Sequence, residues 1–390
     1  MPVYQSAGKI PTKRHIVFRN ENGNLYHEEL FGTEGFSGLS SLVYHLHPPT
    51  KVLSIGKPVS VKPEIALEEN MHAMSFLSFN VKPQTDFLDS RKTFFVNNDL
   101  QCGVAAPKKS MTDYFYKNAQ CDELLFIHKG SGTLQTMFGS LAFSYGDYLI
   151  IPRGIVYQIH FDTEDNHILF LESNSPIETP DRYRNNYGQF LETSPFCERD
   201  FRAPVNLETH DETGEFLVKI KKRGMMWDYV YETHPFDVVG WDGMSYPYAF
   251  SIFNFEPITG RIHMPPPIHQ TFQAKNFVIC SFVPRMYDYH PDAIPAPYHH
   301  SNIDSDEILY YVDGDFMSRN NIQKGQITLH PGGVPHGPHP GAIERSIGKK
   351  ETKEMAVMID PFNPVMITKD AMKMEVKNYY RSWIEEEILS

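Results

Sequence analysis

The chain has 390 residues, a net charge of −12 and 41% apolar residues. This length exceeds what one hydrophobic core usually supports, so two lobes are expected, and the apolar content excludes global disorder. No Lys/Arg-rich block is present, which argues against nucleic acid as a partner. An aromatic content of 13%, with 29 Pro and 25 Gly, favours short strands and turns over long helices.

The four cysteines lie far apart in the sequence, at Cys102, Cys121, Cys197 and Cys280. Because no Cys-x-x-Cys pair occurs, they indicate neither a zinc ribbon nor a disulfide framework, and we interpret them as buried free thiols. The N-terminus lacks a charged segment followed by an apolar one, and no apolar run reaches about 18 residues. A soluble, cytoplasmic protein with no membrane partner is therefore expected.

Short strands are predicted along the chain from runs of aromatic and β-branched residues. They fall at residues 76–81, 216–220, 248–253, 277–282 and 355–359. Between them, the polar segment 176–211 is expected to link two lobes and to cover a sheet edge.

The C-terminal residues 376–389 have an apolar period of 3.6, which predicts a closing amphipathic helix. Its apolar face would consist of Val376, Tyr380, Trp383 and Ile384. We expect this face to pack on a barrel rather than to bind a ligand.

Two sequence blocks occur twice in the same order. Residues 116–130 match 300–314 at an offset of 184, and both copies share Asn, an Asp-Glu pair, an apolar run and Gly. Residues 146–157 match 325–336 at an offset of 179, and both copies read Gly-x5-Pro-x-Gly. A strand, a turn and a second strand, repeated in each half, predict two antiparallel barrels packed together.

The two blocks resemble the motifs of the cupin family, and the resemblance implies that the second copy supplies two imidazoles and one carboxylate as metal ligands: His300, Glu307 and His336. This set suits non-haem Fe(II), because it leaves coordination positions open for substrate and O2. A structural zinc site would instead close its shell, usually with Cys. The sequence therefore predicts an Fe(II) site in the second copy.

Two neighbours compete for these ligand positions, and the first copy provides a control. His299 precedes His300, and Asp306 precedes Glu307, but the register of the repeat favours the later residue of each pair. The first copy has Tyr116, Glu123 and Tyr157 at the three aligned positions. One carboxylate alone is a poor metal site, so the first copy is predicted to be metal-free.

The two blocks resemble the consensus motifs of the cupin family, with Asn302 in place of the second histidine of the first motif. The resemblance implies an all-β bicupin: two jelly-roll β-barrel lobes with a few short helices. We expect a degenerate lobe at 1–175, a linker with edge strands at 176–230, and a catalytic lobe with the closing helix at 231–390.

Three further segments resemble homogentisate 1,2-dioxygenases: residues 235–243, 296–307 and 331–338. The likeness covers most of residues 230–360, and in the N-terminal half it rests mainly on the degenerate copy. It implies that His300, Glu307 and His336 hold Fe(II). One residue more than expected separates the first histidine from Glu307, and Phe316 stands where a substrate-contacting tyrosine is expected.

The resemblance also implies roles for residues around the metal. His263 is the first choice for a base that takes the proton of a phenolic substrate, and His269 is the second choice. His330 would contact substrate or O2, or would fix a ligand from behind. Tyr298, His269 and Asn302 are assigned to the substrate side of the pocket.

The implied activity is Fe(II)-dependent cleavage of homogentisate by O2 to 4-maleylacetoacetate, a step of tyrosine and phenylalanine catabolism. The implied partners are an aromatic acid, O2 and further copies of the chain in a trimer or hexamer. Three alternatives stay open: a dioxygenase for gentisate or another dihydroxy-aromatic acid, a metal-dependent cupin isomerase or sugar-binding protein, and a non-catalytic cupin. Isomerases usually keep four ligands where this chain keeps three, and the intact second copy argues against an empty site.

Overall fold

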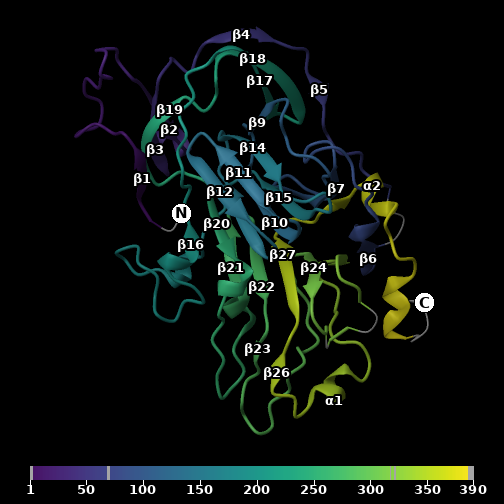
Figure 1. Cartoon of the computed structure of the whole chain (residues 1–390). Helices are drawn as coiled ribbons and strands as arrows, with labels where there is room; N and C mark the ends of the chain where they lie inside the picture. Colours follow the sequence, from purple (N-terminus) through teal and green to yellow (C-terminus); the bar gives the residue numbers. More distant parts are fainter. Residues whose placement is uncertain (1–2, 68–70, 317, 320–321, 385–390) are drawn as a thin grey trace.

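The computed structural model describes residues 3–67, 71–316, 318–319 and 322–384, and most of its regular structure is β-sheet (Figure 1). Within these residues the α-helices are α1 (Ala342–Ser346) and α2 (Lys369–Met372). The 3-10 turns are η1 (Glu34–Phe36), η2 (Ser78–Asn80), η3 (Asp181–Tyr183), η4 (Glu198–Asp200), η5 (Ile252–Asn254), η6 (Pro266–His269) and η7 (Tyr379–Trp383). The all-β prediction is confirmed. None of the described helices is long and apolar enough to cross a membrane.

Two eight-stranded sheets form the upper lobe in Figure 1. The first has the order β16 (Phe201–Arg202), β20 (Tyr248–Ser251), β13 (Asp147–Ile151), β10 (Asp122–Lys129), β15 (His167–Ser173), β8 (Leu100–Ala105), β7 (Arg91–Val96) and β28 (Met366–Ile367). The second has the order β12 (Gly139–Phe143), β11 (Gly132–Thr136), β14 (Val156–Phe161), β9 (Phe115–Asn118), β17 (Thr213–Lys222), β18 (Met225–Thr233) and β4 (Val52–Ile55), and β5 (Val59–Ser60) also pairs with β18.

A six-stranded sheet forms the lower lobe. Its order is β21 (Gln270–Ala274), β22 (Phe277–Phe282), β27 (Met355–Pro361), β24 (Glu307–Asp313), β25 (Gln326–His330) and β6 (Met74–Leu77). A two-stranded ribbon, β23 (Arg285–Met286) with β26 (Glu351–Thr352), extends from this lobe. A separate four-stranded sheet has the order β1 (Gln5–Gly8), β19 (Val238–Gly243), β3 (Ser40–His45) and β2 (His27–Gly32).

The two copies of the repeat fold into equivalent hairpins. In the first copy Glu123 of β10 lies opposite Ile151 of β13, and in the second copy Glu307 of β24 lies opposite His330 of β25. These pairs occupy matching positions of the repeated blocks. The repeated glycine after each first strand has a positive φ in both copies, 100° at Gly130 and 92° at Gly314, as the turn requires.

All five predicted strands exist, but two end earlier than expected. The strand predicted at 76–81 ends at Leu77 because η2 follows, and the strand predicted at 248–253 ends at Ser251. There the Ser251 side chain accepts a hydrogen bond from the backbone of Phe253 and caps η5.

Strands cross the expected lobe boundaries in both directions. β6 comes from the N-terminal part of the chain but pairs with β25 in the lower sheet. β20 and β28 come from the C-terminal part but join the sheet of β13 and β7. The division into 1–175, 176–230 and 231–390 therefore does not coincide with the division into sheets.

The segment 176–211 runs along the sheet edges in turns rather than in long strands. Its β16 pairs with β20, and the Tyr183 hydroxyl donates to the backbone carbonyls of Pro267 and Gln270. The segment thus attaches to both lobes.

The predicted C-terminal helix is wrong for the residues that the structure describes. Asn378 has a left-handed φ of 59°, and η7 follows it as a short 3-10 turn. Tyr379 is buried, whereas Tyr380 and Ile384 of the expected apolar face are exposed. Residues 385–389 lie outside the described residues.

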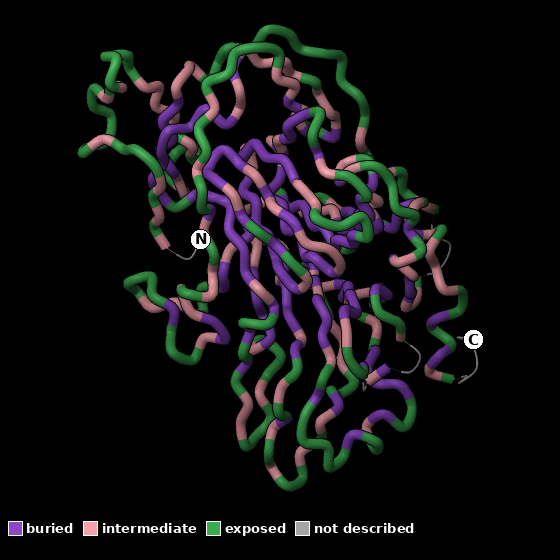
Figure 2. The backbone as a smooth tube through the Cα atoms, in the orientation of Figure 1, coloured by how far each residue is buried: buried purple, intermediate pink, exposed green. Residues whose placement is uncertain are grey.

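One hydrophobic core runs through both lobes, and Figure 2 shows the buried chain concentrated where the sheets meet. Polar side chains at the contact between the lobes are paired across it. The Tyr148 hydroxyl lies 2.8 Å from the Ser281 hydroxyl, His167 Nε2 lies 3.0 Å from Ser78 Oγ, and His128 Nδ1 bonds the Tyr310 hydroxyl.

These two buried histidines predict a loss of stability in mild acid. Burial lowers the pKa of His128 to about 4 and that of His167 to about 3. Because the unfolded chain takes up these protons near pH 6.5 and the folded chain does not, stability present above that pH is lost as the pH falls. Between pH 7 and pH 5 each histidine should remove about 2 kcal/mol of unfolding free energy.

Urea unfolding at pH 7 and at pH 5 measures this loss. The variant His167→Gln keeps a hydrogen-bonding group near Ser78 but cannot titrate, so its stability should fall by about 2 kcal/mol less than that of the wild type. An equal fall in both proteins contradicts the assignment.

Candidate metal centre

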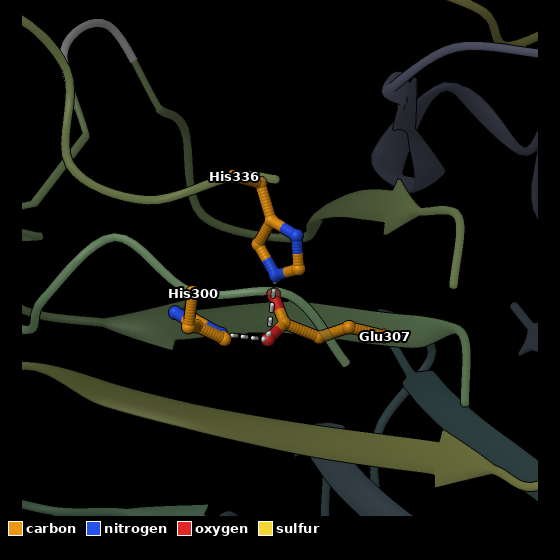
Figure 3. A group of neighbouring side chains, drawn as sticks. All are labelled: His300, Glu307 and His336. Carbon is orange, nitrogen blue, oxygen red and sulfur yellow. Dashed lines mark hydrogen bonds and ion pairs between the residues drawn. The ribbon is translucent and has the colours of Figure 1, made fainter. Parts of the chain in front are cut away.

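Three predicted ligands meet at the start of β24 (Figure 3). Glu307 is the first residue of that strand, and His300 and His336 lie on loops that come together beside it. The two histidines form an isolated antiparallel bridge, with both backbone N–H···O bonds at 2.9 Å. This bridge fixes two imidazoles from distant parts of the sequence next to one carboxylate.

The donor atoms converge on a small volume. Nε2 of His300 lies 3.5 Å from Oε2 of Glu307, and Nε2 of His336 lies 3.4 Å from the same oxygen. One donor atom from each of the three residues lies within 4.8 Å of the others. A divalent cation about 2 Å from each donor fits this spacing.

Backbone carbonyls fix the tautomers of both imidazoles. Nδ1 of His300 lies 3.1 Å from the carbonyl oxygen of Tyr298, and Nδ1 of His336 lies 3.0 Å from that of Val334. Since a carbonyl only accepts, both Nδ1 atoms carry a proton and both Nε2 atoms face Glu307, where an Nε2 donates to the carboxylate when it is protonated and can bind a metal ion when it is not. Metal-binding histidines in proteins are commonly held in this way, so the residues present fit a metal ion.

Glu307 also has a buried imidazole behind it. His330 Nδ1 donates to Oε1 of Glu307 at 2.8 Å, and its ring stacks on His336 with 4.6 Å between centroids. Burial opposes ionisation of Glu307, but hydrogen bonds from the three histidines outweigh it and hold its pKa well below the usual range. Burial lowers the pKa of His330 to about 4. His330 is therefore neutral at pH 7, and within the described chain its Nε2 is buried without a hydrogen-bond partner.

Both competing neighbours lie outside the centre. His299 is exposed, whereas His300 faces Glu307. Asp306 accepts backbone hydrogen bonds from Gly332 and Val365, each at 2.8 Å, so it ties loops together. In each pair, the residue favoured by the register of the repeat is the one that the structure places in the converging group.

The residues assigned to the substrate side are spread around the centre. Tyr298 lies 6.3 Å from the His300 ring and 5.3 Å from the His263 ring, which places His263 at the rim. The His263 side chain is 59% exposed, and its Nδ1 lies 3.5 Å from Asp288.

His269 and Asn302, which were also assigned to the substrate side, and Phe316, which stands where a tyrosine was expected, lie in other surroundings. His269 is buried against Phe282, with 4.8 Å between centroids, and burial lowers its pKa well below the usual value. The Asn302 carbonyl accepts from the backbone of Gly333 at 2.6 Å and so stabilises the turn before His336. Phe316 packs against Tyr311 in a small apolar cluster.

One acidic residue beside the centre escaped the sequence analysis. Asp360 lies on β27, next to β24 in the sheet, and its Oδ1 is buried without a hydrogen-bond partner among the described residues. Burial raises the pKa of Asp360 well above its usual value, and the charge of Glu307 raises it further. The matching segments, Phe170-Leu-Glu172 and Met358-Ile-Asp360, share no identical residue, so no repeat in the sequence indicates Asp360.

Comparison with known proteins places the chain in a family. Residues 43–252 match the family model described as the N-terminal domain of homogentisate 1,2-dioxygenase. A Saccharolobus solfataricus protein, provisionally named a dioxygenase with no substrate in its name, is 41% identical over 98% of this chain and 99% of its own length. The chain belongs to the homogentisate 1,2-dioxygenase family.

Other proteins that the comparisons found are less similar to this chain. Homogentisate 1,2-dioxygenase of Mus musculus is 26% identical over 74% of this chain and 67% of its own length. A cupin 2 conserved barrel domain protein from Leptotrichia buccalis covers 78% of this chain and 100% of that structure, with 10% identity and a TM-score of 0.34. The family match lies mostly outside residues 230–360, so the N-terminal half resembles homogentisate 1,2-dioxygenases more closely than its short motifs indicated.

In this member of the homogentisate 1,2-dioxygenase family, the first copy of the repeat holds a buried ion cluster at the equivalent position. Oε1 of Glu123 accepts from Arg91 at 3.0 Å, and Oε2 accepts from the Tyr157 hydroxyl at 2.8 Å. Glu172 lies opposite Glu123 on the next strand and accepts from Arg91 and Lys221. The positively charged side chains of Arg91 and Lys221 thus neutralise the two carboxylates. The sequence analysis missed these two residues because their strands, β7 and β17, are distant from β10 in the chain.

Removal of one imidazole should remove the metal. We expect His336→Ala to lower divalent metal affinity by at least roughly 100-fold, since even residues that only orient ligands contribute tenfold or more. Metal content after gel filtration measures this. Tyr157→Phe, the matched change in the first copy, should leave the metal content unchanged. Stoichiometric metal in His336→Ala would show that the ligand set is wrong.

The ion cluster of the first copy should be essential for stability. Arg91→Met leaves Glu123 and Glu172 without their shared partner, so the free energy of unfolding should fall by about 3–5 kcal/mol. Lys369→Met, which breaks an exposed ion pair with Glu64, serves as the control and should have no measurable effect. Equal urea midpoints for the two variants would contradict this interpretation.

Proposed function

We propose that this protein is a non-haem Fe(II) dioxygenase that cleaves the ring of homogentisate. The observation that carries the proposal is the convergence of His300, Glu307 and His336 in a chain of this family. When bound, Fe(II) would supply a Lewis-acidic centre with open coordination positions and a redox path between substrate and O2. The reaction adds both atoms of O2 to the ring-opened product, 4-maleylacetoacetate.

The surrounding residues would prepare the substrate. His263 lies at the rim beside Tyr298, where its imidazole can take up the proton of an incoming phenol, and Asp288 orients the ring from the Nδ1 side. His330 is buried and neutral, so its Nε2 lone pair can accept a hydrogen bond from bound substrate. Both roles require a ring hydroxyl.

Phe316 indicates a second candidate class of substrate. This side chain packs on Tyr311 and offers no hydroxyl to a ligand, where a tyrosine was expected. A related dihydroxy-aromatic acid such as gentisate is therefore the alternative to homogentisate. The two acids share the ring hydroxyls and differ in the length of the carboxylate arm.

Oxygen uptake after anaerobic loading with Fe(II) tests both substrates. We expect uptake with homogentisate in a one-to-one ratio, and a product heavier than substrate by the mass of one labelled O2. Glu307→Gln, treated in the same way, should lose more than about 99% of the rate because metal binding requires the carboxylate. Uptake with gentisate alone would transfer the proposal to that acid, and uptake with neither would overturn it.

A further inference from the structure

A row of side chains crosses the six-stranded sheet through Glu307. Ile308 pairs with Ile359, so the preceding and following residues, Glu307 and Asp360, lie opposite each other on neighbouring strands. The same row continues to Val278 on one side and to His330 on the other. Residues paired in this way point to the same face of a sheet, with about 5 Å between their Cβ atoms.

Two buried polar atoms without partners flank Glu307 in this row. They are Oδ1 of Asp360 on one strand and Nε2 of His330 on the other. More than roughly 90% of buried polar groups in proteins are hydrogen-bonded, so two such atoms on either side of a candidate metal ligand indicate an incoming group. Asp360 as a whole is half-buried, whereas its Oδ1 is buried.

In the first copy of the repeat, the carboxylate at the equivalent position has all its hydrogen-bond partners within the protein. Glu172 of β15 lies opposite Glu123, as Asp360 lies opposite Glu307. Glu172 accepts hydrogen bonds from Arg91, Lys221 and Asn118. Asp360 occupies the position in the second copy that Glu172 occupies in the first. Within the described chain, Oδ1 of Asp360 has no hydrogen-bond partner.

Asp360 is not itself one of the three converging ligands. The group whose donor atoms lie within 4.8 Å of one another consists of His300, Glu307 and His336. Asp360 lies one strand farther along the sheet, beyond Glu307 as seen from His330. It is therefore placed to contact a molecule that sits on the metal rather than the metal.

We propose that Asp360 is a specificity-determining residue that hydrogen-bonds a ring hydroxyl of the aromatic acid bound at His300, Glu307 and His336. This inference rests on the proposed function. A hydroxyl can donate or accept, so it matches a carboxyl group in either protonation state. A ligand carboxylate would instead meet the negative charge of Glu307 in the same row. The structure thus assigns to Asp360 the selection of hydroxylated over unsubstituted rings.

A double-mutant cycle between protein and ligand tests this contact. The protein variants are Asp360→Leu, which removes both oxygens at nearly constant shape, and Met358→Leu, a control on the same face of the same strand. The ligands are homogentisate, 2-hydroxyphenylacetate and 3-hydroxyphenylacetate, each titrated anaerobically into Fe(II)-loaded protein by calorimetry. Metal content and thermal unfolding are recorded for every variant.

In the wild type, loss of the contacted hydroxyl should weaken binding by roughly tenfold to a hundredfold. Asp360→Leu should weaken the binding of homogentisate by a similar factor. In this variant, removal of the same hydroxyl from the ligand should not weaken binding further. Met358→Leu should behave as the wild type. Asp360→Asn, which keeps a hydrogen-bonding group, should fall between the wild type and Asp360→Leu, and it remains informative if the apolar variant folds poorly.

Two results separate this inference from the proposed function. If the wild type consumes O2 with homogentisate but Asp360→Leu weakens all three ligands equally, or none of them, the inference about Asp360 is overturned alone. If the wild type neither retains Fe(II) nor binds homogentisate, the proposed function is overturned and the inference with it.

Discussion

The backbone bridge between His300 and His336 is the constraint on which the candidate centre depends. Each residue donates to and accepts from the other at 2.9 Å, and this pairing brings two loops together at the first residue of β24. The carbonyls of Tyr298 and Val334 then fix which imidazole nitrogen faces inward. Main-chain hydrogen bonds thus position two of the three candidate ligands, and the strand β24 positions the third.

The two copies of the repeat differ in the groups that surround their paired carboxylates. Each places a pair of carboxylates side by side on neighbouring strands, a costly arrangement in a buried site without compensating charge. In the first copy Arg91 and Lys221 supply that charge permanently, so the cluster is complete within the protein. In the second copy three imidazoles surround Glu307, and among the described residues Oδ1 of Asp360 has no hydrogen-bond partner. The same pair of strands thus carries a fully paired ion cluster in the first copy and the candidate metal centre in the second.

The sequence predicted the residues that repeat at fixed spacing and missed those that depend on pairing across distant strands. His300, Glu307 and His336 were found because the blocks align, and because the first copy shows what the same positions hold otherwise. Asp360 and Arg91 enter their sites only through the registers of β27 and β7, which no local pattern fixes. The prediction of a C-terminal helix was wrong because Asn378 adopts a left-handed backbone conformation, which the spacing of apolar residues does not indicate.

The exchange of strands shows how the N-terminal part of the chain supports the candidate centre. β6 completes the sheet beside β25, and Leu329, the neighbour of His330, pairs with Met74. The Ser75 hydroxyl of β6 also accepts a hydrogen bond from the Gln326 side chain of β25 at 2.6 Å. Backbone pairing and this side-chain bond therefore both join β6 to the strand that carries His330. Without β6, β25 would be an edge strand with unpaired backbone groups next to the candidate centre. The N-terminal part of the chain is therefore a structural part of the sheet that carries the candidate centre.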